Sequence, residues 1–276
     1  MKVWLDGSLV DEDRAVVSVF DHGLTVGDAV FETIAVREGR PITVTRHLQR
    51  LQRSARLLGL DTPALDELGA AVAEAVAANS LTEAVVRVLV TSGPGPLGSV
   101  RGGRRVTTAV LAGPYPGWAD AADVVVVPWP RNERSALAGV KTTSYAENVV
   151  ALAEARSRRG SEAIFANTVG NLCEGSGSNV FLVLDGVLVT PPLSAGCLAG
   201  VSRAVVIELL GMAVEERDVP VSALAGAEEA FLTSATRYVQ PIRSVDGAVL
   251  PACPGPVTEQ VAVAYSTLLE RDPDPP

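Results

Sequence analysis

The apolar residues of this chain recur at two different spacings, and that alternation restricts the fold to a mixed α/β class. Residues 30–36 are a β-branched stretch typical of a strand. Residues 48–58 then carry leucine and alanine at helical spacing, and Gly59 follows as a stop signal. Strand-like and helix-like stretches continue to alternate along the chain. We therefore predict a mixed α/β protein.

A turn-rich stretch, Gly-Pro-Tyr-Pro-Gly at 113–117, divides the chain into two parts. Beyond it, Ser144 and Glu147 form an S-x-x-E capping box, which predicts a helix that ends near Gly160. A chain of 276 residues is long enough for one large domain or two modest ones. We predict an N-terminal α/β domain over 1–113, an interdomain linker over 114–122, a C-terminal domain over 123–271 and a disordered tail over 272–276.

The charge and composition exclude several classes of partner. The formal net charge is −9, so the surface repels the phosphates of nucleic acids and of anionic membranes. No apolar run is long enough to span a bilayer and the first ten residues do not resemble a signal peptide, so we expect a cytoplasmic protein. The three cysteines lack a CxxC pair and the two histidines lack metal-ligand spacing. We therefore expect neither a disulfide framework nor a metal site.

Lysine is nearly absent from the chain, because only Lys2 and Lys141 are lysines among 23 basic residues. Arginine can fill nearly every role of a surface cation, but it stays protonated and cannot form a Schiff base. An internal lysine that remains in such a composition is a candidate for amine chemistry. The alternative explanation is that a lysine stands at position 141 by chance and has no chemical role.

Three short motifs follow one another from Lys141 onward. Gly139-Val-Lys141 precedes Glu174-Gly-Ser-Gly-Ser-Asn179, and Gly200-Val-Ser-Arg203 comes last. They supply an amine, a carboxylate and a glycine-led helix start with a hydroxyl group. Chemistry based on pyridoxal 5′-phosphate (PLP) needs such a set. A lysine condenses with the aldehyde, an acid keeps the pyridine nitrogen protonated, and backbone N–H groups bind the phosphate.

In these motifs and their order, from Asp6-Gly7 to about Asp246-Gly247, the sequence resembles the fold-type IV PLP enzymes, or class IV aminotransferases. This family includes branched-chain aminotransferases, D-amino-acid transaminases and 4-amino-4-deoxychorismate lyases. The resemblance implies a smaller N-terminal α/β domain and a larger C-terminal PLP-binding domain with a strongly bent or barrel-like sheet. It also implies PLP as the cofactor, a small amino substrate that bears carboxylates, and a homodimer.

The resemblance also assigns roles to single residues. Lys141 matches the Schiff-base lysine, and Glu174 matches the partner of the pyridine nitrogen. Arg50, in His47-Leu-Gln-Arg50-Leu51, matches the arginine that binds the phosphate, a role that suits a bidentate donor. Tyr145 lies near the tyrosine that some members place beside the cofactor's phenolic oxygen. The other cofactor-binding residues that the resemblance implies are Ser178, Asn179, Val201, Ser202, Ser234 and Ala235.

The reaction depends on residues that face the substrate. The loop at 92–98 lacks the arginine and histidine of D-amino-acid transaminases, and Phe31-Glu-Thr-Ile-Ala35 replaces the Phe-Glu-Gly-Ile-Arg of branched-chain enzymes. Thr33 matches a threonine that lyases of the family often carry, where its hydroxyl assists proton transfer. We therefore expect Lys141 and Thr33 to be the catalytic residues of a 4-amino-4-deoxychorismate lyase, which releases 4-aminobenzoate and pyruvate for folate biosynthesis.

Three alternatives to the lyase remain open. The first is an amino-acid transaminase, of the branched-chain or D-amino-acid type, that uses the same cofactor residues. The second is a PLP-binding or metabolite-sensing domain without catalysis, and the third is a structural α/β protein without a cofactor. The carboxylates of a lyase substrate require cationic or N–H donors, whichever loop supplies them. The candidates are Arg101, Arg104 and Arg105 in the loop after residues 84–91, and Thr236 in a second loop.

Overall fold

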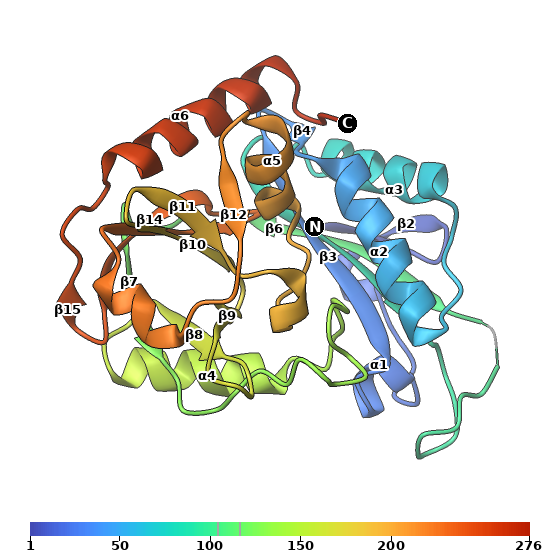
Figure 1. Cartoon of the computed structure of the whole chain (residues 1–276). Helices are drawn as coiled ribbons and strands as arrows, with labels where there is room; N and C mark the ends of the chain where they lie inside the picture. The colour runs from blue at the N-terminus through green and yellow to red at the C-terminus, as the bar shows by residue number, and fades with distance from the viewer. Residues whose placement is uncertain (104, 116) are drawn as a thin grey trace. The chain divides into compact units, whose positions relative to one another are not determined.

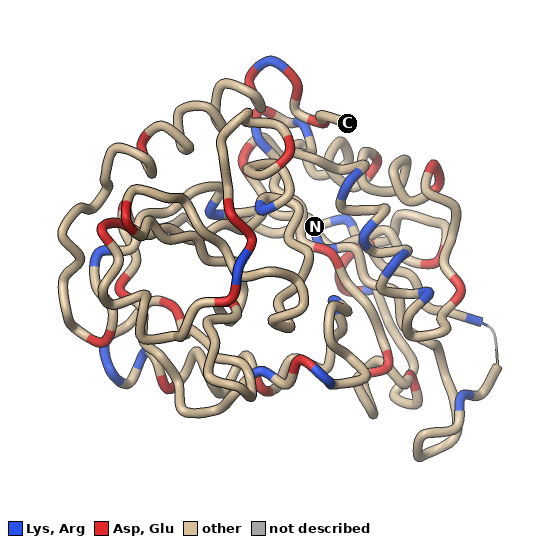
Figure 2. Tube along the Cα trace, in the orientation of Figure 1, with Lys and Arg blue, Asp and Glu red and all other residues tan. Residues whose placement is uncertain are grey.

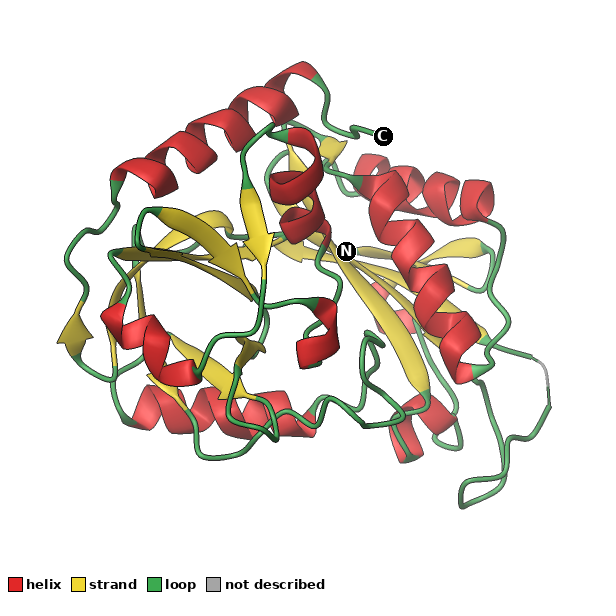
Figure 3. Ribbon diagram, in the orientation of Figure 1, coloured by secondary structure: helices red, strands yellow, loops and turns green. Residues whose placement is uncertain are grey.

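The computed structural model describes residues 1–103, 105–115 and 117–276, and the chain divides into two compact units (Figure 1). The first unit comprises Met1–Pro116, Val140–Tyr145 and Asp272–Pro276, and the second comprises Gly117–Gly139 and Ala146–Arg271. Both units contain strands and helices (Figure 3). The predicted mixed α/β class is confirmed.

The first unit is built on a six-stranded antiparallel sheet with the order β2-β1-β6-β5-β3-β4. Its strands are β1 (Lys2–Leu5), β2 (Ser8–Asp11), β3 (Ala29–Arg37), β4 (Arg40–Pro41), β5 (Ala84–Thr91) and β6 (Thr107–Pro114). Its helices are α1 (His22–Thr25), α2 (Val44–Leu58) and α3 (Leu65–Ala78), with a 3-10 turn at Glu12–Arg14. The predicted helix at 48–58 is thus α2, and Gly59 ends it with a φ of 66°.

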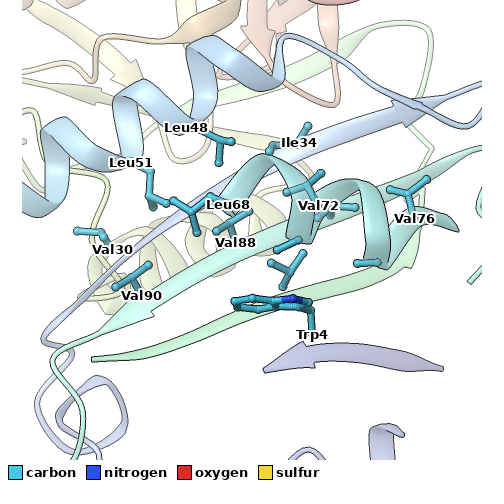
Figure 4. Packing of buried hydrophobic residues seen from close by; sticks show 14 of the residues in the cluster. Trp4, Val30, Ile34, Leu48, Leu51, Leu68, Val72, Val76, Val88 and Val90 are labelled. Carbon is cyan, nitrogen blue, oxygen red and sulfur yellow. The ribbon is translucent and has the colours of Figure 1, made fainter. Parts of the chain in front are cut away.

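The core of the first unit lies between one face of this sheet and the helices α2 and α3 (Figure 4). Leu51 on α2 and Leu68 on α3 are fully buried against Val30 and Val88 of the sheet. Each such side chain contributes on the order of 1.5–3 kcal/mol relative to an exposed position. The helical spacing in the sequence therefore marks the face by which α2 packs on the sheet, and this packing fixes the position of its polar residues.

Two segments far along the sequence also belong to the first unit. Val140–Tyr145 runs beside β3, where Thr143 N donates to the Ala29 carbonyl at 3.0 Å. In the tail, the Asp274 carboxylate accepts hydrogen bonds from Thr45 N at 2.9 Å and Thr45 Oγ1 at 2.6 Å, at the start of α2. The boundaries expected from sequence, 123–271 for the second domain and a disordered tail over 272–276, differ from this division. Contacts between residues so far apart in the chain leave no local signal.

The second unit contains a nine-stranded sheet with the order β12-β11-β10-β13-β14-β7-β8-β9, and β15 pairs with β14. Its first strands are β7 (Ala122–Val126), β8 (Glu162–Ala166), β9 (Leu172–Gly175), β10 (Asn179–Leu184) and β11 (Val187–Thr190). The others are β12 (Val214–Glu216), β13 (Glu229–Ser234), β14 (Tyr238–Val245) and β15 (Ala248–Val249). Although β9 is last in the order, it lies beside β10, so the sheet curls back on itself. The expected bent sheet is confirmed.

Three helices accompany this sheet: α4 (Ala146–Ser157), α5 (Val201–Leu209) and α6 (Pro256–Arg271), with 3-10 turns at Leu193–Ala195 and Val221–Gly226. One apolar cluster fills the inside of the curl, and a second packs α4 against β7 and β8. The curl brings the ends of several strands together, so loops far apart in the sequence can share side-chain contacts. Among the described residues, no helix is long and apolar enough to cross a membrane.

Candidate active site

Lys141 lies in the first unit, in the extended segment beside β3. Phe31 N donates to the Lys141 carbonyl at 3.0 Å, and Lys141 N donates to Ser54 Oγ on α2 at 3.2 Å. The side-chain Nζ lies 4.5 Å from the centre of the Phe31 ring and 5.9 Å from that of Tyr145. The two rings meet edge to face, 5.4 Å apart. The backbone therefore fixes where the amine stands, and two aromatic rings form part of its surroundings.

A buried carboxylate, Glu32, lies on the other face of β3, because successive strand residues point to opposite sides. It accepts hydrogen bonds from Nε and Nη2 of Arg50, both at 2.7 Å, and Nδ1 of His47 is 2.7 Å from its Oε2. Burial raises the pKa of Glu32, but Arg50 and His47 together outweigh burial and hold this pKa well below its usual range. Burial also lowers the pKa of His47, more than Glu32 raises it, and Nδ1 is the ring nitrogen that faces the carboxylate. Arg50 is thus fixed in orientation by two parallel hydrogen bonds.

Thr33 and Arg87 share the face of the sheet that carries Phe31. Thr33 pairs with Arg87 across β3 and β5, and Arg87 Nη2 lies 3.5 Å from Thr33 Oγ1, at the outer limit of a hydrogen bond. The guanidinium carbon of Arg87 is 4.7 Å from the centre of the Phe31 ring, the same ring that the Lys141 amine contacts. An amine and an exposed guanidinium therefore approach one aromatic ring.

The expected substrate arginine, Arg101, forms an ion pair in this structure. Its guanidinium donates two hydrogen bonds to the Asp28 carboxylate, both at 2.7 Å, and one each to the carbonyls of Leu58 and Gly59. The hydrogen bond from Arg101 is the main reason why the pKa of Asp28 is lowered. Arg101 thus fastens its loop to the end of α2, and its role in substrate binding stays a prediction. Arg104 lies outside the described residues, and Arg105 is exposed.

Glu174 lies in β9 of the second unit, one residue before the strand ends, and its carboxylate contacts a backbone N–H group and an arginine. Leu198 N donates to Oε2 at 2.9 Å, and Arg131 Nε lies 3.2 Å from Oε1. Arg131 itself stacks on Phe165, 4.1 Å from the ring centre, and pairs with Glu147. Because a cation and a backbone N–H both favour the charged form of a carboxyl group, this environment suits an acid that acts as a fixed negative charge.

The motif at 200–203 forms the first turn of α5, with Gly200 as the N-cap. Gly200 has no side chain with which to cap the helix, and the N–H groups of the first turn point toward the helix start, as in any α-helix. Asn179 Nδ2 donates to the Leu198 carbonyl at 2.9 Å, and a Cβ at position 200 would lie only 1.9 Å from Asn179 Oδ1. Ser202 Oγ accepts a hydrogen bond from Tyr265 on α6 at 3.1 Å. Its own proton can therefore be donated to another group.

The turn between β13 and β14 carries the last group of expected residues. Arg237 N donates to Ser234 Oγ at 3.2 Å, which closes the turn around Ala235 and Thr236, both half-buried. Ser178 lies in the loop between β9 and β10, and its hydroxyl donates to Glu162 at 3.1 Å. In the part of the chain that the structure describes, no group of three or more His, Cys, Asp or Glu is arranged to hold a metal ion.

The comparisons with known proteins agree on one family. Its sequence model, described as amino-transferase class IV, matches residues 29–245. The chain belongs to the class IV aminotransferases. It is 32% identical over 283 residues to a branched-chain-amino-acid aminotransferase of Salmonella typhimurium, with 95% of this chain and 91% of the relative covered. It is 30% identical over 278 residues to a D-alanine aminotransferase of Bacillus licheniformis, with 96% and 95% covered. The family resemblance seen in the sequence is confirmed.

Solved structures of class IV aminotransferases share this fold. The branched-chain aminotransferase of Thermoproteus uzoniensis, solved with norvaline, has a TM-score of 0.91 and 36% identity, and the match covers 98% of this chain and 94% of that one. The branched-chain amino acid aminotransferase of Thermobaculum terrenum, solved in its PLP form, has a TM-score of 0.88 and 28% identity, with 98% and 94% covered. Class IV aminotransferases depend on PLP.

The donors in this class IV aminotransferase fit PLP group by group. The first unit offers an amine, on Lys141, and an arginine whose orientation is fixed, Arg50. The second unit offers a carboxylate beside a cation, Glu174, and the start of α5, where the backbone N–H groups of the first turn point out of the helix end. These are the partners that an aldehyde, a pyridine nitrogen and a phosphate require.

Three residues that contact the candidate site residues are not among those predicted from the sequence. Glu32 orients Arg50, Arg87 lies beside Phe31 and Lys141, and Arg131 contacts Glu174. The first two did leave a signal, because each is a charged residue within an otherwise apolar strand. Arg131 left none, because it lies in an irregular segment and meets Glu174 only through the fold.

Proposed function

We propose that this class IV enzyme is an amino-acid transaminase in which Lys141 carries PLP. The observation on which the proposal rests is the Phe31 ring with the Lys141 amine 4.5 Å and the Arg87 guanidinium carbon 4.7 Å from its centre. A transaminase needs an amine that moves a proton at the substrate's α-carbon and a cation that pairs with a substrate carboxylate. The relatives support the same reaction, since the chain matches a branched-chain-amino-acid aminotransferase and a D-alanine aminotransferase over nearly their full length.

The proposed roles of the other residues follow from their partners. Glu174 faces the pyridine nitrogen, and Arg131 helps to keep it charged. Arg50, oriented by Glu32, binds the phosphate, as do the N–H groups at Val201 and Ser202 and the turn at Ser234 and Ala235. When bound, PLP supplies the electron sink that stabilises the carbanion at the substrate's α-carbon. The proposed cofactor and substrate residues also include Tyr145, Ser178, Asn179 and Thr236. Of these, Asn179 acts through the start of α5.

The experiment that tests this function supplies the holoenzyme with amino donors and 2-oxoglutarate. L-Leucine, L-valine, L-isoleucine and D-alanine are offered in turn, and glutamate and the corresponding 2-oxo acid are measured. We expect transfer from at least one donor, and none with Lys141→Arg at equal PLP content. Absence of transfer from all four donors would refute the proposal. Arg87→Met should raise KM for the donor about 10- to 150-fold, from the loss of a charge-assisted hydrogen bond.

Aminodeoxychorismate lyase is the second candidate, because Thr33 lies on the face of the sheet that carries Phe31 and Arg87. The comparisons support the transaminase better than the lyase that the sequence analysis favoured. Release of 4-aminobenzoate and pyruvate from aminodeoxychorismate, without amino transfer from any amino acid, would reverse that order. In that case Thr33→Ala should slow the lyase reaction strongly, while in a transaminase it should have little effect.

We also propose that two copies of the chain associate through an apolar surface of the first unit. Val19, Phe20 and Leu97 are 70%, 52% and 79% exposed, and Gly95 N donates to the Phe20 carbonyl at 3.1 Å, so the two segments lie together. Clustered exposed apolar side chains are typical of a covered interface. Sedimentation should give the mass of a dimer, and Phe20→Glu should shift it toward a monomer. A wild-type monomer at all concentrations would exclude this association.

A further inference from the structure

A buried carboxylate in the second unit, Glu162, gathers polar groups from two different loops. It is the first residue of β8 and is 1% exposed. Ser176 N donates to Oε1 at 3.1 Å, the Ser176 hydroxyl also contacts Oε1, and the Ser178 hydroxyl donates to Oε2 at 3.1 Å. Both serines belong to the loop between β9 and β10. A Cβ at Gly175 would lie 2.2 Å from Ser178 Oγ, so this loop packs tightly around the carboxylate.

The second group that reaches Glu162 is Arg237, from the turn between β13 and β14. Its Nη2 donates to Glu162 Oε2 at 2.9 Å, and its side chain is only 4% exposed. The guanidinium carbon also lies 3.7 Å from the centre of the Trp118 ring, and Nη1 donates to Gln240. The charge of Arg237 is therefore neutralised and its geometry is fixed from three sides.

A buried ion pair is seldom a source of net stability, because desolvation opposes the attraction between the charges. Its effect here is geometric. Glu162 connects the loop that contains Ser178 to the turn that begins at Ser234, and these two segments are far apart in the sequence. Because Arg237 N also donates to Ser234 Oγ, the residue that Glu162 holds in place contacts the turn directly.

We propose that Glu162 is a positioning residue that, through Arg237, holds the turn at Ser234–Thr236 in the conformation that receives the cofactor's phosphate. This inference rests on the phosphate role proposed above for Ser234 and Ala235. It requires that Glu162 affect ligands with a phosphate group and leave the rest of the cofactor's contacts unchanged. A purely structural role would instead weaken every ligand equally or lower stability alone.

The test measures the dissociation constants of apoprotein for PLP and for pyridoxal, which lacks the phosphate. For Glu162→Gln we expect PLP to bind on the order of 10- to 100-fold more weakly, the effect typical of residues that orient a ligand's direct partners, and pyridoxal to bind as in the wild type. Glu229→Gln is the matched control, because Glu229 is also buried, in β13 of the same sheet, but accepts from Val257 N and Thr258 N at the start of α6. This control should lower stability without changing PLP affinity.

Arg237→Met provides a second variant in case Glu162→Gln fails to fold. It should weaken PLP by a similar factor, and the double variant should be no weaker than either single one, because both remove the same link. Unchanged PLP affinity, or an equal loss for PLP and pyridoxal, would overturn the inference. A wild-type protein that binds no PLP would instead refute the cofactor assignment, and PLP binding without amino transfer would refute only the proposed reaction.

Discussion

Replacing Glu32 by glutamine should be among the most damaging single substitutions in the first unit. The change keeps the size of the side chain but leaves the guanidinium of Arg50, 6% exposed, without its counter-charge. Removing one partner from a buried ion pair costs about 3–5 kcal/mol. The same change also frees the orientation of Arg50, so PLP binding should weaken with it.

The assay for Glu32 is urea unfolding of the apoprotein, followed by tryptophan fluorescence, to which Trp4 in the core of the first unit contributes beside Trp118 and Trp129 of the second. Glu38→Gln is the control, because Glu38 forms only an exposed ion pair with Arg40 and should change the unfolding free energy by less than about 1 kcal/mol. Arg50→Met in the Glu32→Gln background should recover part of the loss, since no unpaired charge then remains buried. If Glu32→Gln and Glu38→Gln have equal effects, the buried pair does not stabilise the unit.

Lowering the pH should reduce the contribution of the Glu32–Arg50 pair to the unfolding free energy. The pKa of Glu32 in the folded protein is lowered from an ordinary value of 4.5, so its contribution is complete above that pH. As pH falls through the folded pKa the contribution is lost. The Glu32→Gln variant should lack this part of the acid dependence.

Three further predictions concern groups near this site. The pKa of His47 is lowered from 6.5 in the folded protein, so as the pH falls His47 binds a proton in the unfolded chain before it does so in the folded one. The unfolding free energy should therefore decrease below about pH 6.5, by up to about 1.4 kcal/mol per pH unit. A pH series of urea unfolding in which His47→Gln keeps the wild-type slope would contradict this. Arg101→Gln should speed proteolysis within residues 92–106 without changing KM for the amino donor, and a raised KM would support Arg101 as a substrate residue. Asp274→Ala should lower the unfolding free energy by about 1 kcal/mol by removing a cap from α2, and a variant as stable as the wild type would show that the tail does not hold the helix.

The elements that could be predicted from sequence are those whose cause is local. The apolar spacing of 48–58 and the glycine after it define α2 without reference to the rest of the chain. The capping box at Ser144 and Glu147 is the opposite case. A helix does begin there, at Ala146, but the Ser144 hydroxyl donates to the Gly27 carbonyl at 3.1 Å and Glu147 pairs with Arg131. The sequence pattern of a capping box is therefore present, but both side chains contact residues far away in the sequence.

In the candidate site, too, residues with a local signal in the sequence differ from those that depend on distant partners. Composition and motif order drew attention to Lys141, and the family resemblance assigned roles to Lys141 and Glu174; both assignments stay predictions. Arg101 could not be told from a substrate-binding arginine, because its partner Asp28 is 73 positions away. Glu32 and Arg87 were visible as charges within largely apolar strands, but only the pleat and pairing of β3 and β5 show that Glu32 faces Arg50 and Arg87 faces the ring beside Lys141.

The central claim is that Lys141 carries the cofactor of an amino-transferring enzyme. The most direct measurement reduces the PLP-loaded protein with borohydride before and after an excess of the best amino donor, and then maps the modified peptide by mass spectrometry. We predict that the reduced cofactor is attached to Lys141 before the donor is added and is absent from the protein after it, because the amino group has moved to the cofactor. Attachment to Lys2, or labelling of Lys141 that the donor does not change, would contradict the account.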